Sequence, residues 1–172
     1  MVLQLVGSDI VHLDKSTFMW VQMTHFAIDV DQADVEILAS LIGSPEYTHD
    51  YASPFPSESA PFGTPIHGRW FLNAINVDRF ETTTADRAEA DLHSWANEQD
   101  WTEPGYRQPP DAMHRLQAVY SLLRAGDIYK LHNPGPEAEH DYGFVTAGMG
   151  FHEFIVIDRR TATLHVIVAS DD

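Results

Sequence analysis

The N-terminal part of this chain favours β-strands, because apolar and β-branched residues dominate it. Val, Ile, Phe, Trp and Thr are frequent there, and these residues pack well on a pleated surface. The predicted strands cover residues 2–6, 10–13 and 17–30, with the Gly-Ser-Asp run at 7–9 as the first turn. A short apolar run at 66–77 also suggests a buried strand, although its pattern alone does not separate it from a buried helix.

The pattern changes to a helical period in three segments. In the first, Val35, Leu38 and Ile42 form one stripe, which Ile37 and Leu41 join at its edge. Asp31 is expected to cap this helix, and Gly43 to adopt the left-handed conformation after it. Two further helices are predicted at 84–99, capped by Thr84, and at about 110–125. Shorter strands are expected after them at 127–132 and 143–148.

The clearest element is a C-terminal β-hairpin between residues 151 and 169. If Asp158 faces Thr163, Val156 faces His165, and both faces of the hairpin carry mostly apolar side chains. Such a hairpin must be covered on both sides, one against the helices and the other against a further layer or a second copy of the chain. The pattern therefore raises the expectation of a homo-oligomer formed through this C-terminal hairpin.

The order of elements, strands first, then a helix, a strand, two helices and final strands, predicts an α+β domain. We expect a mostly antiparallel sheet with about three helices packed on one face and a C-terminal β-hairpin. The length of 172 residues suits a single globular domain, residues 1–172. Within it, residues 44–65 form a long loop with five prolines. Loops of this length are often functional, so its aromatic residues Tyr51, Phe55 and Phe62 are candidate binding residues.

A net charge of −16 is the strongest compositional signal, since 26 acidic residues face 10 Lys and Arg. Such a charge repels nucleic acid and anionic lipid, so neither is an expected partner. Adaptation to salt, simple solubility and attraction to a basic protein partner all remain as explanations. The sequence shows no membrane-spanning run and no signal peptide, which predicts a cytoplasmic protein.

Histidine, arginine and carboxylates are the candidate chemical groups, because the chain has no cysteine. His67 suits a general base if a carboxylate orients it, with Arg69 and His140 as further catalytic candidates. The segment His132–Asp141 contains imidazole and carboxylate groups, but its spacing matches no metal motif. In the predicted hairpin His152 and His165 lie roughly 13 Å apart, too far to share one ion. We therefore expect neither a metal nor a cofactor.

Two functions are compatible with these observations. The first is a non-enzymatic binding protein, of the inhibitor or immunity kind, that meets a protein partner, for which a basic protein is one candidate. The alternative is a small-molecule-binding domain or an enzyme, in which residues 44–65 close over a pocket that contains His or Arg. A deep pocket with converging polar groups would favour the alternative, whereas a broad exposed patch would favour the binding protein.

Overall fold

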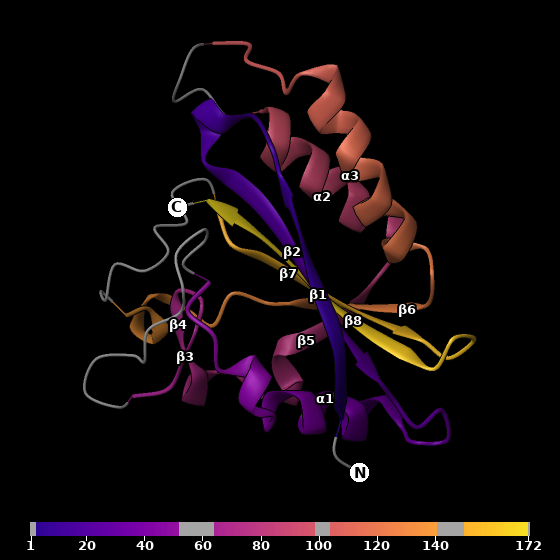
Figure 1. Cartoon of the computed structure of the whole chain (residues 1–172). Coiled ribbons are helices and arrows are strands. Elements are labelled where there is room, and N and C mark those ends of the chain that lie inside the picture. The colour runs from indigo at the N-terminus through magenta and orange to yellow at the C-terminus, as the bar shows by residue number, and fades with distance from the viewer. Residues whose placement is uncertain (1–2, 52–63, 99–103, 141–149, 172) are drawn as a thin grey trace.

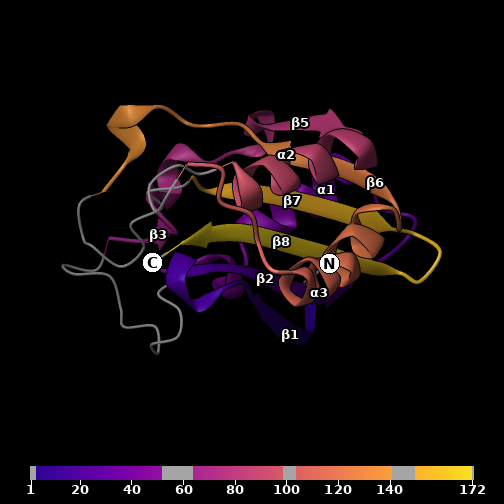
Figure 2. The same cartoon turned by 90° about the horizontal axis from the view of Figure 1, so that it is seen from above.

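An antiparallel sheet with helices on both sides forms the centre of the protein (Figure 1). The structure is a computed structural model that describes residues 3–51, 64–98, 104–140 and 150–171. Within these residues the sheet has six strands in the order β1-β2-β8-β7-β6-β5, and every neighbouring pair is antiparallel. The strands are β1 Gln4–His12, β2 Met19–Ala27, β5 Phe80–Thr83, β6 Asp127–Leu131, β7 His152–Asp158 and β8 Thr163–Asp171. Figure 2 shows this order from β5 to β1.

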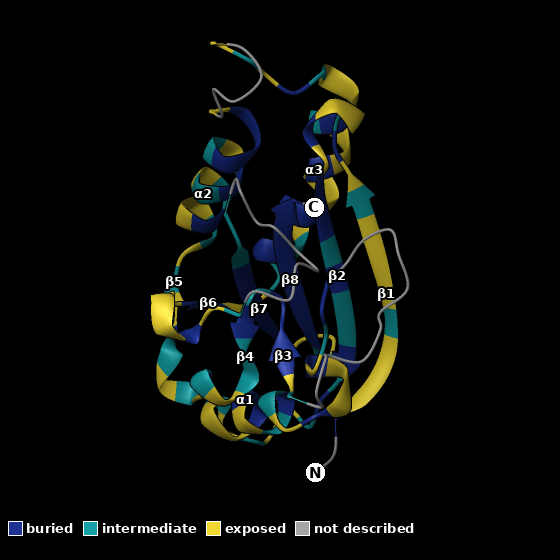
Figure 3. Cartoon of the chain, turned by 90° about the vertical axis from the view of Figure 1, so that its left-hand side faces the viewer, coloured by how far each residue is buried: buried dark blue, intermediate teal, exposed yellow. Residues whose placement is uncertain are grey.

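The three helices of the described residues are α1 Asp34–Ile42, α2 Ala85–Asn97 and α3 Pro110–Leu123. The α+β class and the mostly antiparallel sheet are therefore confirmed. The prediction that the helices pack on one face was wrong, because they are divided between the two faces of the sheet: α1 packs on one face, and α2 and α3 pack together on the other. Figure 3 shows α1 well separated from α2 and α3. No helix of the described residues is long and apolar enough to cross a membrane.

The predicted register of the C-terminal hairpin is confirmed. Asp158 pairs with Thr163, and Val156 pairs with His165. Both strands lie in the middle of the sheet, where helices of the same chain cover each face. Since the chain itself buries the hairpin, a second copy is not needed to cover it, and the homo-oligomer stays a prediction without this support.

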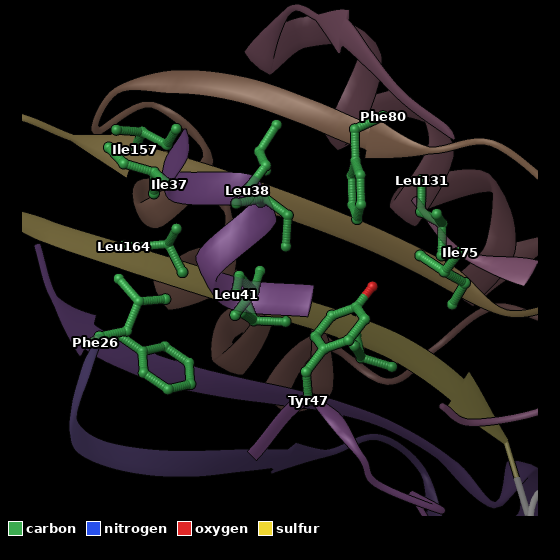
Figure 4. Close-up of a cluster of buried hydrophobic side chains, with 14 of the residues drawn as sticks. Phe26, Ile37, Leu38, Leu41, Tyr47, Ile75, Phe80, Leu131, Ile157 and Leu164 are labelled. Carbon is green, nitrogen blue, oxygen red and sulfur yellow. The ribbon is translucent and has the colours of Figure 1, made fainter. Parts of the chain in front are cut away.

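Apolar side chains on the α1 face show why the first helix forms where it does. Ile37, Leu38 and Leu41 are buried and lie among Ile157 and Leu164 of the hairpin (Figure 4). The predicted stripe was shifted, because Val35 is exposed. The helix also starts later than predicted: Ala33 takes the cap position, and the Glu36 side chain accepts a hydrogen bond from the Ala33 amide. Gly43 adopts a right-handed conformation, so the predicted left-handed end was wrong.

The N-terminal strand runs without interruption through the Gly-Ser-Asp segment at 7–9, so the predicted turn there was wrong. A register shift between Leu5 and Gly7 absorbs one extra residue, as in a β-bulge. β1 is an edge strand whose surface is largely exposed. Its small and polar residues therefore lie on no buried face, and they do not disturb hydrogen bonds to a second neighbouring strand. Residues that usually form turns therefore did not indicate a turn in this edge strand.

The run 66–77 forms a small hairpin in place of one strand. β3 Ile66–His67 pairs with β4 Trp70–Phe71, and short 3₁₀ turns follow. Gly68 enables this turn, since its φ of +56° lies in the left-handed region. A β-carbon there would also approach the Phe151 ring to 2.2 Å. The sequence pattern missed the turn, and it also missed β5, a strand of only four residues.

The second and third helices form as predicted. Thr84 caps α2 by accepting a hydrogen bond from the Arg87 amide at 3.3 Å. Trp95 and Leu116 are buried between these helices and the sheet, as their spacing predicted. The strand expected at 143–148 lies outside the described residues.

Candidate functional site

A network of buried polar side chains joins three segments on the α1 face. Tyr47 comes from a 3₁₀ turn, Pro45–Tyr47, His67 from β3 and Glu153 from β7. The Tyr47 hydroxyl donates to one oxygen of Glu153 at 2.7 Å, and the other oxygen lies 2.5 Å from Nε2 of His67. The side chains of His67 and Glu153 are fully buried. A buried carboxylate needs such partners, because burial removes its hydration.

The hydrogen bonds of His67 define where its protons lie. Its Nδ1 is 2.6 Å from the backbone carbonyl oxygen of Tyr47, and a carbonyl only accepts, so Nδ1 carries a hydrogen. Nε2 and the Glu153 carboxylate therefore share one further proton across their short contact. This arrangement holds the imidazole ring in one orientation, as a carboxylate does for a general base. Glu153 therefore orients the ring, but both ring nitrogens of His67 are engaged inside the core, so neither faces a substrate in this arrangement.

Aromatic rings pack around this buried network. The Tyr47 ring stacks on the His67 ring at a centroid distance of 3.7 Å, and the edges of Tyr51 and Phe151 face the same imidazole. Burial, followed by the charge of Glu153, raises the pKa of Tyr47 well above its ordinary value, and the same causes raise the pKa of Tyr51. Both phenols therefore remain protonated at neutral pH, and the network holds its segments together beneath the surface.

The other predicted catalytic candidates point elsewhere. Arg69 forms an ion pair with Glu139 at 2.9 Å, and Nε2 of His140 donates to the Gly68 carbonyl oxygen at 2.5 Å. These contacts attach the segment around residues 136–140 to the β3–β4 hairpin. His67 faces inward to Glu153, whereas Arg69 and His140 lie on the outer side of the same hairpin. A catalytic role for any of the three stays a prediction.

The predicted binding residues are only partly described. Tyr51 is buried and stacks on Trp20 at 6.0 Å, which makes it part of the core. Phe55 and Phe62 lie outside the described residues, as does Asp141 of the acidic loop. In the described parts of the chain, no group of three or more His, Asp or Glu residues is placed to hold a metal ion.

A pocket of about 390 Å³ lies beside the network, where β4, the end of β6 and the start of β7 meet. We call it the cationic pocket. It is lined by Arg69, Trp70, Lys130, Leu131, His132, Asn133, Gly150, Phe151 and His152. Among the described residues, this lining contains two formal cations and two imidazoles but no carboxylate. In a chain with 26 acidic and 10 basic residues, this composition is unusual.

Each of the two cations that line the cationic pocket is paired with a carboxylate. Lys130 pairs with Asp91 of α2 at 2.6 Å, and Arg69 pairs with Glu139, yet neither acidic residue lines the pocket. Burial, followed by the charge of Lys130, lowers the pKa of His152. His152 is therefore a neutral hydrogen-bonding group at pH 7, and the positive charge comes from Arg69 and Lys130.

The buried network and the cationic pocket share their supports. His67 pairs with Trp70 across the β3–β4 hairpin, and Glu153 directly follows His152 in β7. The short contact between His67 and Glu153 therefore fixes the two walls of the pocket relative to each other. Binding groups held by such a second layer of hydrogen bonds keep a defined geometry.

Two other hollows on the described surface lack this charge arrangement. One is lined by Asp14, Asp111, Lys15 and Arg115 among apolar residues of β1, and the other by Asp86, Glu89, Glu98 and Arg124 with His93 and Ala90. Carboxylates line both of them. Clustering of cations without lining carboxylates thus distinguishes the cationic pocket from these two hollows.

A second polar pair lies on the opposite face of the sheet, between β2 and β8. Nδ1 of His25 and Nδ1 of His165 are 2.8 Å apart, so one ring donates and the other accepts. Asp9 of β1 lies 3.4 Å from the remaining nitrogen of His25. Burial, followed by the neighbouring His25, lowers the pKa of His165.

No known protein family is matched. The chain fits none of the family models, and neither curated proteins nor solved structures include a significant match. The function is therefore argued from the geometry of the site. Sequence reasoning missed Glu153, Tyr47, Lys130 and His152. One signal was present for Glu153: strand alternation places it on the same buried face as Ile155, where a carboxylate must find a partner.

Proposed function

We propose that the protein binds a small organic anion in the cationic pocket. The observation that carries the proposal is the lining itself, which gathers Arg69 and Lys130 without a carboxylate on a strongly acidic chain. A cavity of this kind concentrates anions locally even when the whole molecule repels them. This proposal corresponds to the alternative function predicted from the sequence, a small-molecule-binding domain, and it names the residues that would form the site.

The shape and chemistry of the lining favour a particular kind of anion. A volume of about 390 Å³ lies within the range of small-ligand sites. Arg69 offers a planar fork for a carboxylate or phosphate, and Lys130 offers a point charge. Trp70, Leu131 and Phe151 supply apolar surface beside these charges. A carboxylate or phosphate attached to an apolar or aromatic group uses both features.

Titration calorimetry with inorganic phosphate and phenyl phosphate at constant ionic strength tests this proposal. Both probes should bind saturably, and phenyl phosphate should bind more tightly because its ring contacts the apolar walls. Arg69→Gln and Lys130→Gln should each weaken binding by about tenfold, the effect of losing one charge-assisted hydrogen bond.

Arg124→Gln is the matched control, because Arg124 is also paired with carboxylates, Asp86 and Glu89, but lies outside the pocket. It removes the same charge and should leave the affinity nearly unchanged. Equal losses in all three variants would mean that only the net charge of the protein matters. Absence of saturable binding to either probe would contradict the proposal.

The sequence also suggested a basic protein as the partner. A different part of the surface supports that possibility, the free edge of the sheet at β1. The two proposals are independent, since no residue of β1 lines the cationic pocket.

A further inference from the structure

In the part of the chain that the structure describes, β1 leaves one long edge of the sheet without a strand partner. The strand has nine residues, and within those described residues it pairs only with β2 (Figure 2). The opposite edge, β5, has only four residues. An unpaired strand presents a row of backbone donors and acceptors that can accept another strand.

The β1 edge carries little of the protection that edge strands usually have. Proteins block such edges with Lys, Pro or inward-pointing charges, yet Gln4–His12 contains neither Lys nor Pro, and its one formally charged residue is Asp9. Two features do limit access: the bulge near Leu5, and the Arg115 side chain of α3, which donates to the backbone carbonyl oxygen of His12 at the end of β1. Figure 3 shows β1 largely exposed, in contrast to the buried β7 and β8.

Exposed apolar side chains gather along this edge. Six large apolar side chains are exposed among the described residues, and four of them lie on β1 or in the turn after it: Leu5, Val6, Ile10 and Phe18. Val6 is 67% exposed and Phe18 is 64% exposed. Isolated exposed apolar residues are ordinary, but a cluster beside an open strand edge is typical of an interaction site.

Phe18 is held in an unfavourable backbone conformation. Its φ of +55° lies in the left-handed region, which bulky residues rarely adopt. Hydrogen bonds on the preceding turn support it, since Thr17 donates to the Asp14 carbonyl oxygen and accepts from the Met19 amide. Strained conformations with supporting bonds cluster at functional sites, and here the strain places an aromatic ring in solvent.

The C-terminal half of β1 opens into a hollow of about 600 Å³. Its lining runs from Ile10 to Lys15 and includes Pro109, Asp111 and Arg115 at the start of α3. A strand lying along β1 would pass the mouth of this hollow. The hollow thus offers a place for a side chain of the added strand, in addition to the backbone pairing.

We infer that the β1 edge binds an extended segment of a basic protein, which adds to the sheet as a further strand. Charge decides between this occupant and a second copy of the chain. Two copies would bring together two chains of net charge −16, whereas a basic partner is attracted by the same charge. Asp9 and Asp111 are exposed beside the edge and its hollow, where they can meet cationic side chains.

The test uses a synthetic peptide of alternating Lys and Val, as long as β1, and follows backbone hydrogen exchange by mass spectrometry. The peptide should bind and slow exchange in β1. A peptide with Glu in place of Lys should not bind. The Lys peptide with every backbone nitrogen methylated keeps its charge but has no backbone donor on either edge, so it should not protect β1.

A pair of double variants separates the edge from the overall charge. Val6→Lys with Ile10→Lys should weaken peptide binding by about tenfold or more, because it places cations and removes apolar surface at the edge. Val30→Lys with Val35→Lys makes the same change in charge at two exposed valines outside β1, and should have a much smaller effect. Circular dichroism verifies that both variants are folded.

Three outcomes would overturn the inference. Equal binding of the methylated peptide would show that charge alone attracts it. Protection of another region would place the interaction elsewhere, and absence of binding would show that the β1 edge does not accept such a segment. A free protein that is already dimeric by light scattering, with β1 protected, would identify a second copy as the occupant.

Discussion

The core on the α1 face of the sheet contains a carboxylate, an imidazole and a phenol, whereas the core on the α2–α3 face is packed mainly by apolar side chains. Both cores are well buried, but different interactions stabilise them. Apolar packing loses free energy in proportion to the volume removed. A buried polar network depends on every member, because a group that loses its partner remains buried with neither a hydrogen bond nor its hydration.

Glu153→Ala should give the largest loss of stability. It leaves the His67 imidazole and the Tyr47 hydroxyl without their common partner in a buried site, so the free energy of unfolding should fall by roughly 3–5 kcal/mol. Urea denaturation measures this change. Glu153→Gln keeps the shape and one hydrogen-bonding oxygen, and should lose less. Equal stability of the Ala variant and the wild type would show that the network does not hold the α1 face together.

On the α2–α3 face, Leu116→Ala should lower the free energy of unfolding by roughly 2–5 kcal/mol, because Leu116 is fully buried and its truncation leaves a cavity. Thermal unfolding should show a lower midpoint. Leu116→Met conserves most of the volume and should cost much less. An unchanged melting temperature in the Ala variant would contradict the assignment of this residue to the core.

The smallest effect concerns a polar pair on the α2–α3 face, His25 and His165. Burial, followed by His25, holds the pKa of His165 below its ordinary value of 6.5. Below pH 6.5 the unfolded chain therefore takes up a proton more readily than the folded protein, so stability falls as the pH drops through this range. His49 and His152, whose pKa values are also lowered by burial, change stability in the same direction.

His165→Asn removes this titration while it keeps a polar group near His25. The free energy of unfolding, measured by urea denaturation from about pH 7.5 to 5.5, should decline less steeply in this variant than in the wild type. Carboxylates ionise at lower pH and affect both proteins alike. Parallel curves for the two proteins would exclude His165 as a source of the pH dependence.

Elements with a strong pattern were predictable from the sequence. The hairpin register followed from alternation once Asp158 was placed opposite Thr163, and α2 followed from its apolar spacing and from Thr84. β1 was misread because its small and polar residues sit on an exposed edge, where they break no core. The β3–β4 turn was missed because Gly68 lies within an apolar run, and because the ring that excludes a side chain there belongs to the distant Phe151.

The candidate site was predictable only in part. His67 and Arg69 were named, since histidine and arginine carry recognisable chemistry. Their partners come from distant segments: Glu153 lies 86 residues after His67, and Lys130 reaches the pocket from β6. No local sequence pattern indicates that these residues lie close together, because their proximity depends on how the β3–β4 hairpin packs against the sheet. Alternation along β7 did place Glu153 on a buried face, and that was the available hint.

The position of β8 has a consequence for folding during synthesis. β8 is made of residues 163–171, and it lies between β2 and β7 in the sheet. The ribosome makes every other strand first, so the β1–β2 hairpin cannot join the β5–β7 part of the sheet until β8 has emerged. From the synthesis of β6 at residues 127–131 until β8 follows, the nascent chain holds two incomplete parts of the sheet, with unpaired edges that chaperones can recognise. A ribosome stalled before codon 163 would therefore carry a chain whose two halves have no strand to connect them.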